Sequence, residues 1–546
     1  MRLFIMLNVG LIIEILFGTT LKKNLLMMPI RFTDTLFQLI KSLEKAEKRN
    51  FKLYIKRSSG NEDLKIIELF DALDKLSEYD ESILLKRLSS IKKPQLSNTK
   101  VHLYKQLLAS LRILKSTDSI DMQLNEQLDH ARILYNKGLY LQSLKILEKL
   151  KETAKLHNKF NFLTQVISWE KKIETLHITR SMQDRGEQLS TEAVEVNTRV
   201  DMVAKLSNLA LRLYSWYIKN GHARNEKDET GVITFLKANL PEKAHEQTGF
   251  YERLYLYQSY CWYAFIRQDF LMYYRYAQKW IDIFHEQPLM IRVETGYYIK
   301  GMHNLLNAHF DLRNFQKFES DLQHFIQFSK TPVANQHDNH RIQTFVYINS
   351  AKINQHFMLG TFAQGLKEVP VIEEKLKEYA HYLDNHRILV FNYKIASLYF
   401  GNGNFDVSID YLQKIINGSD SIRNDLQCYA RLMHLMAHYE LGNFEIIDSL
   451  IRSVYRFMAK MQNLTIVEEE MFKFLRNSFH VHRQKLKPEL QKLLVNLKKL
   501  EKNRFQTRSF AYLDIISWVE SKVLEKPMST IIREKYLHQK KRNYPG

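Results

Sequence analysis

The chain has 546 residues, with 80 Lys or Arg against 60 Asp or Glu and a formal net charge of +20 at pH 7. Its 17 Gly and 9 Pro are few for this length, which argues against a turn-rich β protein and favours either several helical domains or one long solenoid. The two cysteines, Cys261 and Cys428, are too few and too far apart for a multi-thiolate zinc site, and we expect buried thiols in a reducing compartment rather than a disulfide.

Residues 1–27 form a doubtful extension that contains the apolar run Leu3–Phe17. A cleaved signal peptide and a membrane anchor are two interpretations, but Glu14 interrupts the run, no Ala-x-Ala site follows, and the run is short for a membrane span. A third interpretation is a mis-assigned start, with translation beginning at Met27 or Met28. We expect a cytoplasmic protein without a membrane partner unless the extension is real.

Residues 28–119 predict an N-terminal helical domain of four or five short helices. The stretch Phe51–Arg57 alternates like a strand, but a lone strand would have no pairing partner, so we interpret it as helical. We expect Ser97 or Asn98 to cap a helix that runs to about Lys115.

Helical hairpins are predicted over residues 120–470. Each joins two helices with apolar periodicity by a short turn that ends in an aromatic residue, and these aromatics are Tyr140, Phe270, Phe315, Phe362, Phe405 and Phe444. The last five lie 45, 47, 43 and 39 residues apart. A hairpin of this kind cannot bury both of its apolar faces alone, so neighbouring hairpins must stack.

The interval between Tyr140 and Phe270 predicts two further, degenerate hairpins. Within it we expect Phe160–His177 and Val200–Lys219 to be helices. The segment Gly221–Gln247 contains Gly, Pro and many charges, and we expect it to be an irregular insertion.

The hairpins over roughly residues 120–460 resemble the tetratricopeptide repeat (TPR), and the resemblance is strong for three units. In that family a small residue lies in the first helix, a Gly opens the turn, an aromatic begins the second helix, and a small residue follows three positions later. These positions fall on Ala396, Gly403, Phe405 and Ser408 in one unit and on Ala131, Gly138, Tyr140 and Ser143 in another. The Phe444 unit keeps Gly442 but has Leu435 and Ile447 at the small positions.

The resemblance implies an all-α, right-handed TPR-like α-solenoid of stacked antiparallel hairpins. Such a solenoid implies a groove that could hold a peptide or a partner domain. We expect it to be preceded by the helical N-terminal domain and closed by a C-terminal cap.

Residues 471–546 lose the repeat signature and contain 18 Lys or Arg against 6 Asp or Glu. We predict a basic amphipathic helix at Leu486–Leu500, an apolar capping helix at Phe510–Leu524 and a frayed tail at Arg533–Gly546. Clustered cations are either a solvated surface or a polyanion-binding patch. The candidate polyanion-binding residues are Lys492, Lys498, Lys499, Lys502 and Arg504.

The segment Tyr251–Tyr276, which we expect to be a helix, has the most unusual composition, with aromatic residues on more than one helical face. It is either buried on both sides between hairpins or an aromatic lining of the groove, where Tyr provides contact area at low entropic cost. On the second interpretation the arginines contact acidic groups of the partner. The candidate partner-binding residues are Arg253, Tyr257, Tyr260, Arg267 and Tyr274.

Sequence motifs for catalysis are absent: there is no GxxxxGK, GxGxxG, HExxH or GxSxG. His480 and His482 would face apart on a helix, and in the cluster His337–His340 we expect Asp338 or Asn339 to be a helix cap rather than a metal ligand. We therefore expect no enzyme, cofactor or metal site. The expected function is a scaffold that binds a protein or peptide partner, and the alternative is nucleic-acid binding through the basic C-terminal region.

Overall fold

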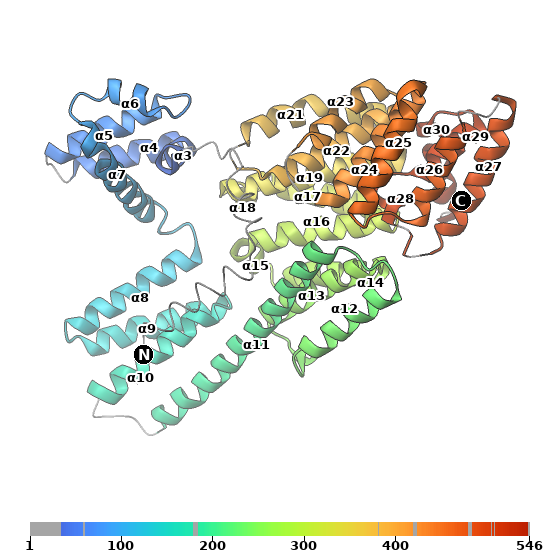
Figure 1. The fold of residues 1–546 in the computed structure, drawn as a ribbon. Helices are drawn as coiled ribbons and strands as arrows, with labels where there is room; N and C mark the ends of the chain where they lie inside the picture. The colour runs from blue at the N-terminus through green and yellow to red at the C-terminus, as the bar shows by residue number, and fades with distance from the viewer. Residues whose placement is uncertain are drawn as a thin grey trace, which may run out of the picture. The chain divides into compact units, whose positions relative to one another are not determined.

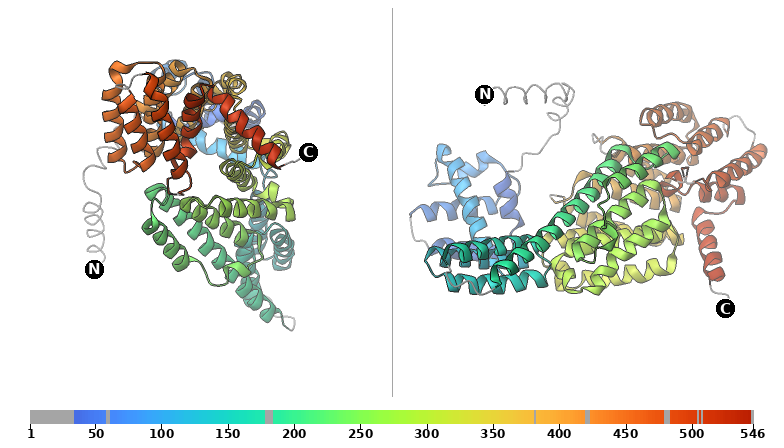
Figure 2. Two further views of the ribbon diagram at one scale, coloured as in Figure 1. Left: turned by 90° about the vertical axis from the view of Figure 1, so that its right-hand side faces the viewer. Right: turned by 90° about the horizontal axis from the view of Figure 1, so that it is seen from below.

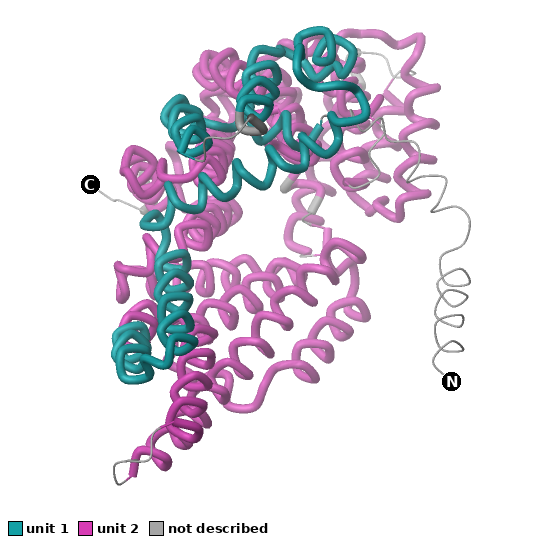
Figure 3. The backbone as a smooth tube through the Cα atoms, turned by 90° about the vertical axis from the view of Figure 1, so that its left-hand side faces the viewer, with its two compact units in different colours: residues 1–150 teal, residues 151–546 magenta. Residues whose placement is uncertain are grey.

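The computed structural model describes residues 34–57, 61–177, 184–380, 382–418, 423–478, 483–503, 505–506 and 508–543. In these ranges the ordered elements are helices and there is no strand, which confirms the predicted all-α, solenoid-like class (Figure 1). The chain divides into two compact units, Met1–Leu150 and Lys151–Gly546 (Figure 3). The interpretations of residues 1–27 lie outside the described residues.

The first unit is a helical domain with its own core, in which Phe51 packs on Phe70 with ring centroids 4.9 Å apart. Its helices are α3 (Thr35–Ser42), α4 (Lys45–Lys56), α5 (Asn61–Asp74), α6 (Glu81–Arg87), α7 (Lys93–Leu114), α8 (Ile120–Asn136) and the start of α9 (Tyr140–Leu156). The helical interpretation of Phe51–Arg57 is confirmed within α4. The predicted cap at Ser97 or Asn98 is wrong, because Pro94 lies in the first turn of α7 and the cap is Lys92.

The second unit continues as a succession of helices, most of which pack on their neighbours in the sequence. They are α10 (Phe160–His177), α11 (Arg185–Asn220), α12 (Glu226–Asn239), η1 (Ala244–Glu246), α13 (Phe250–Arg267), α14 (Phe270–Glu286), α15 (Leu289–Val293), α16 (Thr295–Asp311), α17 (Phe315–Ser329), α18 (Pro332–Asn335), α19 (Asp338–Leu359), α20 (Phe362–Leu366), α21 (Val369–Glu378), α22 (Asn385–Asn402), α23 (Phe405–Ile416), α24 (Asn424–Glu440), α25 (Phe444–Lys460), α26 (Ile466–Ser478), α27 (Arg483–Leu500), α28 (Arg508–Tyr512), α29 (Ile515–Leu524) and α30 (Met528–Asn543).

Two predictions about the middle of the chain need correction. Val200–Lys219 is only part of α11, a single long helix (Figure 2). The segment Gly221–Gln247 is not irregular throughout, because it contains α12, which Asn225 caps through its side chain.

The C-terminal predictions also need correction. The apolar segment Phe510–Leu524 is two helices, because the Asp514 side chain accepts a hydrogen bond from the Ser517 backbone and starts α29 there. The tail is not frayed within the described residues, since α30 extends to Asn543 and anchors itself through the buried Ile531 and Ile532.

The turn prediction holds at the hairpin glycines: Gly138, Gly403 and Gly442 have φ of 78°, 87° and 74°. This is the left-handed region that glycine enters without steric cost. A buried serine follows two of these turns, and each serine donates a hydrogen bond to the first helix of its hairpin. Ser143 Oγ donates to the Ala131 carbonyl at 2.8 Å, and Ser408 Oγ donates to the Ala396 carbonyl at 2.9 Å.

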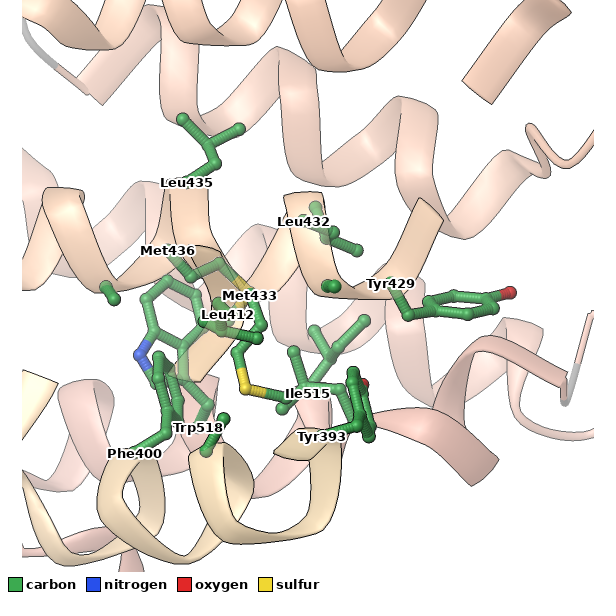
Figure 4. Packing of buried hydrophobic residues seen from close by; sticks show 14 of the residues in the cluster. Tyr393, Phe400, Leu412, Tyr429, Leu432, Met433, Leu435, Met436, Ile515 and Trp518 are labelled. Atoms are coloured by element: carbon green, nitrogen blue, oxygen red, sulfur yellow. The ribbon is translucent and has the colours of Figure 1, made fainter. Parts of the chain in front are cut away.

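The largest core joins the last hairpins to the C-terminal helices. Figure 4 shows Ile515 and Trp518 of α29 among buried side chains of α22 and α24. Trp518 Nε1 donates to Glu440 Oε1 at 2.5 Å, so its polar atom is satisfied although the side chain is buried. The last helix, α30, adds Ile532 to this core and packs on α19, α22 and α29.

Candidate functional site

The aromatic segment Tyr251–Tyr276 is a hairpin rather than one helix. Gln268 ends α13 with a φ of 57°, and Asp269 caps α14 by accepting a hydrogen bond from the Met272 backbone. Phe270 therefore begins a second helix, as the turn pattern predicted.

Tyr257 and Tyr260 lie together between α13 and α14. The Tyr260 ring stacks on Tyr276 with centroids 4.3 Å apart, and its hydroxyl lies 2.9 Å from His245 Nε2. The Tyr257 ring contacts the same Tyr276 ring at 6.0 Å. Tyr260 is buried, and burial raises its pKa to about 12, so most of its surface already contacts the chain.

Of the other predicted partner-binding residues, Arg253 lies within hydrogen-bonding reach of Tyr257, whereas Arg267 and Tyr274 make contacts elsewhere. Arg253 forms an ion pair with Glu286 at 2.6 Å, and Arg267 forms one with Glu229 at 2.8 Å. The Tyr274 hydroxyl accepts a hydrogen bond from Lys317 Nζ at 2.8 Å. Each of the two arginines therefore has a carboxylate within the chain, at opposite ends of α13.

A second set of residues, which sequence analysis did not single out, forms a continuous row across α13, α16, α19 and α22. We call it the cross-helix row, and its members are Tyr255, Tyr297, Lys300, His303, Tyr347, Asn354 and Lys394. The hydroxyls of Tyr255 and Tyr297 lie 3.1 Å apart. His303 stacks on Tyr347 with centroids 4.0 Å apart, and Lys394 Nζ donates to Asn354.

The positive charge of the cross-helix row comes chiefly from Lys300, because burial lowers the pKa of Lys394 to about 7. Burial lowers the pKa of His303 well below its usual value, and the nearby Lys300, Lys394 and Arg387 lower it further. Lys300 Nζ lies 5.4 Å from the Tyr347 ring centroid. Among the described residues no carboxylate forms an ion pair with Lys300.

One end of the row opens into a cavity of about 390 Å³ between α16 and α19. Tyr297, Lys300, His340 and Tyr347 line it together with Glu294. The Glu294 carboxylate is already engaged, because it accepts from Lys159 Nζ at 3.2 Å and from the Tyr251 hydroxyl. One signal in the sequence could have found this row: Tyr297, Lys300 and His303 recur at helical spacing on α16.

A second cavity, of about 260 Å³, lies between the hairpins and the C-terminal helices of the second unit. We call it the aromatic cavity because six of its lining residues are Phe270, Phe310, Phe315, Phe357, Tyr512 and Tyr536. Asp311 also lines it, and burial raises the pKa of this carboxyl to about 7. Among the described residues Asp311 has no ion pair or hydrogen bond through its side chain.

In the described part of the chain, no group of three or more His, Cys, Asp or Glu side chains lies close enough together to hold a metal ion. His337, not Asp338 or Asn339, is the residue that precedes α19, and Asp338 forms an ion pair with Arg341 at 2.6 Å. His480 and His482 lie outside the described residues.

The two cysteines are buried thiols that do not form a disulfide, as predicted. Burial raises the pKa of the Cys261 thiol, which disfavours the reactive thiolate. Among the described residues no helix has the length and the apolar character needed to cross a bilayer.

The basic C-terminal candidates are partly matched by carboxylates. Lys492 pairs with Glu489 and Lys498 pairs with Glu520, each at 2.7 Å. Lys499 and Lys502 are exposed. Arg504 lies outside the described residues. Exposed pairs of this kind contribute little to stability, but they reduce the charge available to a polyanion.

Comparison with models of known protein families finds no match for this sequence, and comparison with curated proteins finds none either.

Proposed function

We propose that this chain is a non-catalytic scaffold whose TPR-like hairpins bind a peptide or a partner domain along the cross-helix row. The observation that carries the proposal is the continuity of this row across four helices. Its side chains are half-buried except for the buried Asn354, and its tyrosines and lysines are aromatic and cationic, the kinds of side chain that contribute strongly at protein interfaces.

Charge gives the partner a chemical preference. Lys300 forms no ion pair among the described residues, although Arg387 pairs with Asp384 at 3.7 Å, and Glu294 at the end of the row already has a cation and a hydroxyl as partners. An acidic partner segment would therefore meet complementary charge, which steers encounter and fixes the binding register.

A pull-down from lysate of the native cells, with and without nuclease, tests the proposal. The test variant combines Lys300→Ala with Tyr347→Ala. The matched control combines Lys317→Ala with Tyr274→Ala, because Lys317 Nζ lies over the Tyr274 ring at 5.2 Å in a nearly identical cation–π pair. We expect a stoichiometric protein that resists nuclease, is lost from the test variant and remains with the control.

Three outcomes would overturn this assignment. Retention of every partner by the test variant would exclude the cross-helix row. Loss from the control variant alone would move the interface to the α13–α14 hairpin and its predicted residue Tyr274. Partners that disappear with nuclease, together with steep salt dependence, would favour the basic C-terminal region and nucleic acid instead.

A further inference from the structure

The aromatic cavity is lined by several aromatic rings and by the Asp311 carboxyl group. Its walls come from α14, from the turn between α16 and α17, from α19, α20 and α22, and from the C-terminal helices. The α30 side of the cavity is held by packing, since the Phe315 and Tyr536 rings meet edge to face with centroids 4.8 Å apart. Aromatic side chains therefore surround the cavity from both the hairpins and the C-terminal segment.

Asp311 is the charged group of this cavity whose burial shifts its pKa most, and among the described residues its side chain forms no ion pair or hydrogen bond. The nearest opposite charge that affects it is Lys394, which favours its ionised form but forms no ion pair with it. Lys394 is already engaged with the Asn354 side chain and with the Ser350 carbonyl, 3.5 Å away. A half-buried carboxylate without an ion pair or a hydrogen bond is unfavourable unless a ligand supplies the missing charge.

The remaining charged groups in the lining are Arg313, Glu501, Asp514 and Lys535. Lys535 pairs with Glu520 at 2.6 Å and donates to Ser517 Oγ at 2.8 Å, so it does not neutralise Asp311. Asp514 is occupied in capping α29. The lining thus has three carboxylates against two cations, one of which is already paired.

We propose that the aromatic cavity binds an alkylated ammonium group, with Asp311 as its counter-ion. A cation is attracted to the faces of aromatic rings, and alkyl substituents on the nitrogen bury apolar surface against the same rings. The carboxylate adds the opposite charge in a site that water enters poorly, where charge interactions are strong.

The size of the cavity limits the ligand. The volume of the cavity is about 260 Å³. This accommodates a quaternary ammonium head with a short chain, but not a folded domain. The group could belong to a free small molecule or to a modified lysine side chain of a peptide, and the same chemistry would bind either.

Isothermal titration of the full chain tests the proposal with choline and with its neutral isostere 3,3-dimethyl-1-butanol. We expect choline to bind at least ten-fold more tightly than the isostere. Asp311→Asn should weaken choline binding at least ten-fold and leave the isostere unchanged. The exposed Asp410→Asn is the matched control and should leave both affinities unchanged.

A second arm identifies the source of the ammonium group. Acetyl-trimethyllysine-methylamide is titrated beside choline, and tighter binding of the blocked amino acid assigns the site to a peptide, whereas tighter binding of choline assigns it to a free compound. Equal binding of choline and the neutral isostere, or unchanged choline binding by Asp311→Asn, would overturn the proposal. The proposal would also be overturned if neither ammonium probe bound at 10 mM. Thermal unfolding of Asp311→Asn verifies that this variant is folded.

Discussion

Two hairpin turns, at Gly360 and Gly403, have the same backbone but different surroundings. Both glycines are left-handed, with φ of 65° and 87°, and a Phe follows each of them two residues later. A Cβ at Gly403 would meet nothing within 4 Å. A Cβ at Gly360 would overlap the Ser529 carbonyl oxygen and would lie 3.0 Å from the Arg533 backbone nitrogen.

The two turns therefore require glycine for different reasons. At Gly403 the chain needs only a positive φ to end a helix. At Gly360 it also needs room, because the first turn of α30 lies directly against the turn. The need for a positive φ can be predicted from the repeat pattern. The need for space cannot, because it depends on which distant helix packs on the turn.

The largest effect is expected from Gly360→Ala. The new methyl group meets backbone atoms of α30 that cannot move independently, and a non-glycine residue is also strained at this φ. Together these effects should lower the free energy of unfolding by about 3 kcal/mol. Urea unfolding measures the loss, and amide hydrogen exchange should show faster exchange in α30. Unchanged protection of α30 would contradict the close contact.

The second effect concerns Asp311, which lies in the cavity that α30 helps to enclose. Its pKa is raised to about 7, so between about pH 4 and 7 the folded chain holds a proton that the unfolded chain has released. The stability that this group contributes therefore falls as the pH rises through that window. Asparagine cannot ionise, so Asp311→Asn should gain about 2 to 3 kcal/mol over the wild type between pH 5 and 8.

The groups facing Asp311 must be considered in that experiment. They are Lys394 on α22, Tyr273 on α14, Arg313 beside it in the chain, Lys535 on α30, and the carboxylates Glu501 and Asp514. The pKa of Lys394 is lowered to about 7 by burial, so its own contribution rises with pH above 7 in both proteins. Guanidinium unfolding at pH 5 and pH 8 measures the free energy of unfolding of the wild type and of Asp311→Asn. If this free energy changes equally with pH in both proteins, the pKa of Asp311 is not raised.

A smaller effect is expected from Gly403→Ala. Only the backbone conformation opposes the methyl group, because the space beside it is empty. The loss should be about 1 kcal/mol, the strain of one left-handed alanine. The comparison with Gly360→Ala is the sharpest test of the difference between the two turns, since both variants make the same chemical change. Equal losses would show that α30 adds nothing at Gly360.

The smallest effect is expected from Ser408→Ala, which removes the 2.9 Å bond from Ser408 Oγ to the Ala396 carbonyl. That carbonyl belongs to the body of α22, so a loss of roughly 0.5 to 1 kcal/mol is expected in thermal or urea unfolding. Ser143→Ala removes the equivalent bond to Ala131 and should cost a similar amount. A loss at one serine only would show that the two hairpins do not use this bond in the same way.

Local features of the fold were accessible from the sequence because they depend on neighbours in the chain. The turns at Gly138, Gly403 and Gly442 follow from the need for positive φ, and Phe160–His177 is helical with the predicted bounds because its apolar residues recur at helical spacing. The α30 helix was not predicted, because the composition of its end is polar and its stability comes from Ile531 and Ile532 packing on distant helices.

The candidate sites were harder to predict for the same physical reason. Asp311 follows Phe310 in the last turn of an ordinary amphipathic helix, and only the approach of α30 and the Tyr512 region makes it part of a cavity. The aromatic segment Tyr251–Tyr276 was conspicuous in composition, yet Tyr260 stacks on Tyr276 within it, and its Arg253 and Arg267 pair with Glu286 and Glu229. The composition shows that aromatic residues are abundant, but the packing of the chain determines which of them remain exposed for binding a partner.

The contact between Gly360 and α30 also has a consequence for synthesis of the protein. Ser529 is made about 170 residues after Gly360, which at about 5 to 20 residues per second is a delay of roughly ten to thirty seconds. During that interval the emerging hairpins fold while the surfaces of α19 and α22 that α30 will cover remain exposed to the cell. A ribosome stalled or terminated before Met528 would therefore release a chain with folded hairpins and an uncovered apolar surface, which is the kind of product that chaperones retain and proteases remove.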